Sequence, residues 1–167
     1  QPYEMAVDAS FSMLLSEYWS GGVALRFIFS DLFNGMSDES DYSKGKAFGA
    51  DLSFAYRRPL TINQYHAVAG FGIALTNMGN KISYDNGATY QYIPTNLRFG
   101  GNFEFDFDSY NRLGLAVDFN KLLVPTPYGN LESYDSEEEY EEARDKYNEG
   151  SSIGGIFRSF GDAPGGF

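Results

Sequence analysis

The sequence predicts an all-β fold, an antiparallel transmembrane β-barrel of which this chain supplies about six strands. From Tyr3 to Leu123, six segments place an apolar residue at every second position. The connectors between them are alternately short and long. Because successive strand side chains point to opposite faces, each segment has one apolar and one polar face. Segments of about ten residues with this rhythm are typical of an outer-membrane barrel.

The first two segments are expected at Met5–Leu15 and Trp19–Ser30, joined tightly by Ser16-Glu17-Tyr18. A long polar loop follows at about Asn34–Lys46. The third segment alternates from Phe48, and we expect Arg57-Arg58-Pro59 to end it, because proline has no amide proton for the ladder.

The fourth segment is the weakest and covers Gly70–Leu75. The loop after it, at about Asn77–Thr95, contains Asp85-Asn86-Gly87, a strong signal for a hairpin turn. The fifth and sixth segments alternate most regularly, over Leu97–Phe107 and Leu113–Asn120.

The tail has a different composition. Glu137–Lys146 is predicted to form a short solvated helix on a loop, and the end from Phe160 is typical of a loop. Six strands are too few to close a membrane barrel, whose bacterial minimum is eight. We therefore expect one partial barrel domain over residues 1–167, with strands within 3–123, an extracellular loop region at 122–167, and further sequence before Gln1 and after Phe167.

The composition excludes several function classes. The formal net charge is −11, with 23 acidic and 12 basic residues, so no basic surface is available for a nucleic acid. Aromatic residues make up 17% of the chain, which suits the aromatic girdles of a barrel. There is no cysteine, hence no disulfide and no thiolate site.

The polar residues of the strands are interpreted as the lining of a hydrated barrel interior, where carboxylates and arginines pair across strands. They are Asp8, Arg26, Asp51, Arg98, Asn102, Glu104, Asp106, Asp118 and Asn120. The single histidine, His66, lacks companions for catalysis or zinc binding. The cluster Asp38-Glu39-Ser40-Asp41 lacks the spaced ligands of a calcium loop and is interpreted as solvated surface. We predict no catalytic residue, metal or cofactor.

Several motifs are not explained by barrel periodicity. They are Val23–Ile28, Asn77–Tyr84, Tyr92–Arg98, Asn120–Pro127 and Phe157–Phe167. Together they resemble the PorV family of the type IX secretion system, over nearly the whole chain and in the correct order. The acidic run at 137–146 is the least similar part.

The resemblance implies a FadL-related barrel of fourteen strands in the bacterial outer membrane, with a non-enzymatic role. It also implies three protein partners, namely secreted cargo, the translocon channel and the surface sortase. By analogy with the family's loop surface, the expected partner contacts are Leu123, Val124, Pro125, Pro127, Phe157, Phe160 and Pro164.

Three other functions stay open. A FadL-like transporter of long-chain fatty acids would need an apolar interior pocket, for which the polar-face residues offer little. An envelope enzyme would need a Ser/His/Asp set, which is not evident. A soluble β-sandwich would turn the same apolar face towards an internal core.

Overall fold

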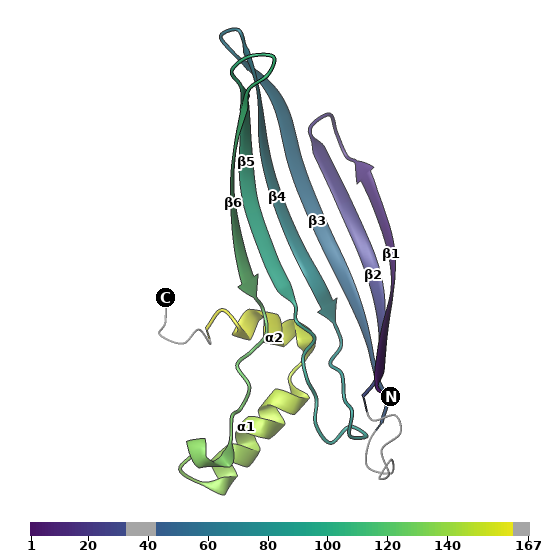
Figure 1. Cartoon of the computed structure of the whole chain (residues 1–167). Coiled ribbons are helices and arrows are strands. Elements are labelled where there is room, and N and C mark those ends of the chain that lie inside the picture. Colours follow the sequence, from purple (N-terminus) through teal and green to yellow (C-terminus); the bar gives the residue numbers. More distant parts are fainter. Residues whose placement is uncertain (33–42, 162–167) are drawn as a thin grey trace.

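The computed structural model describes residues 1–32 and 43–161, and one antiparallel sheet dominates it (Figure 1). Its six strands lie in sequence order: β1 (Tyr3–Leu14), β2 (Trp19–Asp31), β3 (Gly45–Ile62), β4 (Tyr65–Gly79), β5 (Asn96–Asp106) and β6 (Arg112–Leu122). The all-β, antiparallel fold expected from the alternation is confirmed. The strands β1 and β6 form the two open edges of this sheet.

The sheet has two unlike ends. Short turns join β1 to β2, β3 to β4 and β5 to β6 at one end, here called the turn end (Figure 1). The strands β2, β4 and β6 end at the opposite end, here called the long-loop end. The expected rhythm of short and long connectors is therefore present.

The helices lie at the long-loop end, after β6 (Figure 1). They are a short 3-10 turn, η2 (Leu131–Ser133), and two α-helices, α1 (Glu137–Glu149) and α2 (Ser152–Arg158). The structure confirms the acidic helix and extends it by one turn, while α2 was not anticipated. Within the described residues, no helix combines the length and apolar character needed to cross a membrane.

The strand register separates the two faces of the sheet. Val7 pairs with Phe27 and Phe27 with Phe48, so these apolar side chains share one face. Asp8 pairs with Arg26 on the other face. The apolar face is uncovered, with Leu25 67% and Leu115 62% exposed. The apolar face of the sheet is therefore the exposed one.

The prediction that Arg57-Arg58-Pro59 ends the third strand was wrong, because β3 continues to Ile62 and Pro59 pairs with Val68. The amide of Arg57 donates to the Tyr18 carbonyl at 2.9 Å, towards β2. Amides alternate sides along a strand, so the Pro59 nitrogen also faces that side. The β2–β3 pairing ends at Tyr56, so proline removes no ladder bond there.

The fourth strand also runs well beyond the expected Gly70–Leu75 and contains a bulge. Ala50 pairs with Met78 and Leu52 with Leu75, which leaves two residues of β4 opposite Asp51. One of the two, Asn77, has φ 56°. Asparagine adopts this left-handed conformation more readily than most residues, so the sequence suits a bulge at this position.

Candidate functional site

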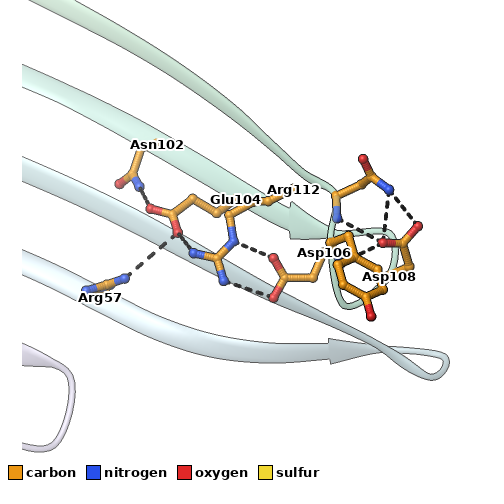
Figure 2. A network of polar contacts seen from close by, with 8 residues as sticks. Arg57, Asn102, Glu104, Asp106, Asp108 and Arg112 are labelled. Carbon is orange, nitrogen blue, oxygen red and sulfur yellow. Dashed lines mark hydrogen bonds and ion pairs between the residues drawn. The ribbon is translucent and has the colours of Figure 1, made fainter.

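An ionic network lies on the polar face near the turn end (Figure 2). Arg112 Nη2 donates to Asp106 Oδ2 at 3.1 Å and Nη1 to Glu104 Oε2 at 3.5 Å. The Arg57 guanidinium lies 3.9 Å from Glu104 Oε2. The network joins β3, β5 and β6, as expected for cross-strand pairing.

A second polar cluster connects β1 through β4 nearer the long-loop end. Arg26 Nε donates to Asp8 Oδ1 at 2.6 Å, and Arg26 Nη1 donates to Asn77 Oδ1. The amide of Asn77 donates to Asp51 Oδ1 at 2.7 Å. The bulge residue is thus fixed by both its backbone and its side chain.

This cluster also positions the segment that follows β4. Thr95 Oγ1 donates to the Asn77 carbonyl at 2.8 Å, and Asn77 Nδ2 donates to the Pro94 carbonyl at 3.3 Å. The start and the end of segment 80–95 are therefore held at one point. The Arg26–Asn77 cluster therefore holds the two ends of segment 80–95 together.

Segment 80–95 folds back on itself through the turn expected at Asp85-Asn86-Gly87. Asn86 and Gly87 both have positive φ, 55° and 93°. Ile82 and Gln91 exchange two backbone hydrogen bonds of 2.8 and 2.9 Å. Asp85 Oδ1 accepts from the Thr89 amide at 2.9 Å, and hydrogen bonds from Thr89 lower the pKa of Asp85.

The folded segment covers the polar face of the sheet at the long-loop end. Ile82 and Ile93 pack with Ala47, which is fully buried, and with Ile28 and Tyr84. Ile28 is two residues beyond Arg26 in β2, so its side chain lies on the polar face. Ala47, which pairs with Ile28, lies on the same face. This small apolar cluster anchors the loop on the sheet.

Lys81 connects this segment to α1. Its ammonium donates to the carbonyls of Tyr147 and Asn148 at 2.6 and 2.9 Å and lies 4.3 Å from the centre of the Tyr92 ring. The last carbonyls of a helix have no partner within it and carry partial negative charge, which a cation stabilises. Burial, followed by repulsion from Arg158, lowers the pKa of Lys81.

The other end of α1 is capped as well. Ser136 Oγ accepts from the Glu139 amide at 3.2 Å, and three glutamates occupy the first turn. Both features favour a helix start. Together with Lys81 they explain how so acidic a segment, with little apolar face, forms a helix here.

Tyr92 is the point where the loops converge. Its ring lies 5.0 Å from that of Tyr147, and its hydroxyl donates to the Gly150 carbonyl at 3.3 Å. A Cβ atom on Gly155 of α2 would lie 2.6 Å from Tyr92 Cε1 and 3.2 Å from Pro125 Cδ. Glycine therefore allows α2 to approach this closely.

An open groove of about 620 Å³ runs beside this cluster. Tyrosines dominate its wall, and Tyr128 contacts both Tyr140 and Tyr147 edge to face, at 5.6 and 5.5 Å. Its other lining residues come from 89–92 and 124–130 and include Val124 and Pro127. Tyrosine offers an apolar body with a polar tip, which suits a peptide-binding surface.

The structure places the seven expected contact residues in different environments. Leu123 and Pro125 are buried and support the loops from within. Val124 and Pro127 line the groove. Phe157 and Phe160 are exposed on and after α2. Pro164 lies outside the described residues. The six described residues therefore do not form one surface.

Several organising residues were missed from the sequence. Lys81, Tyr92 and Tyr147 lie far apart in the chain, and no spacing rule connects them. The concentration of tyrosines in 84–92 and 128–147 was the available signal for the groove.

In residues 1–32 and 43–161, no group of three or more His, Asp or Glu side chains could hold a metal ion. The cluster Asp38-Glu39-Ser40-Asp41 lies outside these residues. His66 pairs with Thr61 across the β3–β4 turn and lies near Asp106 and Arg112.

An antiparallel sheet with an exposed apolar face and an elaborated loop end has the features of the wall of a membrane barrel. Comparison with family models agrees with this class, because residues 1–129 match the model described as type IX secretion system protein PorV. The chain belongs to the PorV family and is a component of the type IX secretion system. A search of curated proteins finds no match.

Proposed function

We propose that this protein lies in the bacterial outer membrane as part of a β-barrel, with its long-loop end at the cell surface. The observation that carries the proposal is the uncovered apolar face of the sheet, which runs through all six strands while the charged side chains pair on the other face. A soluble sandwich would have to cover that face with a second layer. Lipid acyl chains provide the cover here.

The open edges of the sheet support the same view. In lipid, unpaired amides and carbonyls along β1 and β6 would be too costly, so both edges pair with further strands of the barrel. The short turns then face the periplasm and the long loops face outward.

The proposed role at the surface is non-enzymatic binding of secreted cargo, together with contact to the translocon channel and the surface sortase. The groove is the candidate site for cargo, because Val124 and Pro127 combine there with five tyrosines. Aromatic side chains carry much of the energy of protein interfaces. The loops that form the groove are held by Lys81 and Tyr92, so little ordering is required on binding.

Transport of long-chain fatty acids has less support. The hollow near the middle of the sheet is lined by small residues and by charged ones, including Arg98, Glu104 and Asp118. The large apolar side chains beside it, Phe54, Phe71 and Ile73, belong to the opposite face of the sheet. The charged side chains do not favour an apolar chain there. A role in transport would need an apolar surface from another part of the barrel.

Secretion by cells that carry groove variants tests the proposal. Tyr128→Ala with Tyr140→Ala removes two rings of the wall, whereas Tyr110→Ala at the turn end is a matched control, being 96% exposed. We expect cargo to accumulate in the periplasm only with the groove variant, at equal levels of barrel in the outer membrane. Normal secretion by the groove variant would refute cargo binding at this site.

A further inference from the structure

The helix α2 and the turn after it carry a largely exposed apolar stripe. Ile153, Phe157 and Phe160 are 69, 73 and 54% exposed. They recur every three or four residues, on the side of the helix opposite Gly155, which packs against Tyr92 and Pro125. One side of α2 therefore packs against Tyr92 and Pro125, and the opposite side is exposed.

The stripe begins where the apolar face of β6 ends. The ring of Phe160 lies 5.3 Å from the Lys121 ammonium. Lys121 is two residues beyond Phe119, so it belongs to the face of β6 that carries Leu115, Val117 and Phe119. Figure 1 shows α2 running across the strand direction close to the end of β6. Its axis thus lies along the plane of a bilayer that the strands would cross.

The charge nearest the stripe is positive. The helix α2 contains no acidic residue, and the ammonium of Lys121 lies beside the ring of Phe160. Arg158 points to the other side of α2, where its Nη2 atom would lie 3.2 Å from a Cβ atom on Gly150. The acidic helix α1 lies farther from the sheet (Figure 1). The acidic first turn of α1 thus lies away from the level at which β6 ends.

We propose that α2 is an interfacial helix that rests on the outer lipid surface beside β6. Ile153, Phe157 and Phe160 lie at the boundary between head groups and acyl chains, while Lys121 reaches towards lipid phosphates. The inference rests on the proposed membrane location of the sheet. Its consequence is that α2 fixes the height of the groove above the membrane.

Quenching of tryptophan fluorescence by brominated lipid tests the contact. The 167 residues contain one tryptophan, and Trp19→Phe, with replacement of any tryptophan elsewhere in the protein, gives a background in which one new reporter is read. The reporters are Phe157→Trp on α2, Leu115→Trp on the apolar face of β6, and Leu131→Trp in the exposed η2 turn. Each intact protein is reconstituted in phosphatidylcholine vesicles with and without bromine on the acyl chains.

We expect bromine to reduce the emission of Phe157→Trp about twofold, as it does for Leu115→Trp, because both rings touch lipid. The emission of Leu131→Trp should hardly change. If Leu115→Trp is quenched but Phe157→Trp behaves like Leu131→Trp, the α2 proposal is overturned and the membrane location of the sheet stands. A stripe reserved for a protein partner would give that result. If Leu115→Trp is not quenched, the membrane location itself fails.

Discussion

The ammonium of Lys81 lies 2.6 Å from the carbonyl oxygen of Tyr147, across 66 positions of the chain. This one contact joins the loop after β4 to the end of α1. Since Tyr92 packs on both residues, the long-loop end behaves as one structural unit. The groove depends on that unit, because Tyr92 and Tyr147 form part of its wall.

Replacing Lys81 tests this relationship. Lys81→Met keeps the apolar stem but removes the charge-assisted hydrogen bonds at the end of α1. We expect a loss of ~1–2 kcal/mol in local stability, or about tenfold lower protection of the α1 amides. Hydrogen exchange measured by mass spectrometry would detect it. The matched control is Lys146→Met, at an exposed position of the same helix. Equal protection in the two variants would contradict the role of Lys81.

The close approach of α2 to Tyr92 gives a second prediction. Gly155→Ala places a Cβ atom 2.6 Å from the Tyr92 ring, so α2 must move away. Trypsin should then cleave after Arg158 several-fold faster, because local opening exposes the backbone. Gly161→Ala is the control, since its Cβ meets only an ordinary contact at 3.6 Å. An unchanged cleavage rate in Gly155→Ala would contradict close packing of α2 against Tyr92.

Segment 80–95 should respond to acid. The pKa of Asp85 is lowered by hydrogen bonds from Thr89, so its contribution to stability is fully present above its ordinary value near 4. The contribution is lost as pH falls through the lower value of the folded protein. Amide protection at Ile82 and Gln91, corrected for intrinsic exchange, should fall in that acidic range. Asp85→Asn should remove the pH dependence. If amide protection in Asp85→Asn falls equally with pH, the pH dependence comes from another titrating group.

The strand around Pro59 provides a contrast between two neighbouring positions. Pro59→Thr should leave the melting temperature nearly unchanged, because the nitrogen at this position faces no partner strand. Arg57→Pro removes the amide that donates to Tyr18 and should cost more than about 1 kcal/mol. Thermal unfolding in detergent measures both. The explanation of the long strand is wrong if the two variants melt alike.

The sequence predicted the strands well because burial on one face only imposes a period of two. Met5, Val7 and Phe11 required no tertiary information to be placed together. The same reasoning failed at Pro59, where the outcome depends on how far the neighbouring strand extends. It also could not locate the bulge at Asn77, which is fixed by contacts from Arg26 and Asp51.

The long-loop end was harder to predict for a different physical reason. The acidic helix follows from its composition and its Ser136 cap, but α2 has only seven residues, two of them glycine. Its position depends on packing against Tyr92, more than 60 residues away. Of the expected contact residues, Val124 and Pro127 stay candidates for the groove. Phe157 and Phe160 belong to a motif that barrel periodicity does not explain, but the sequence did not show that they lie on a surface apart from the groove.

The orientation of the sheet in the membrane is the claim on which the account most depends. The 167 residues contain no cysteine, so with any cysteine elsewhere in the protein replaced, single substitutions can be labelled specifically on intact cells with a maleimide that does not cross membranes. Leu131→Cys at the long-loop end should be labelled from outside, and Tyr110→Cys at the turn end only after the outer membrane is permeabilised. Labelling of Tyr110→Cys on intact cells, with Leu131→Cys protected, would contradict the account.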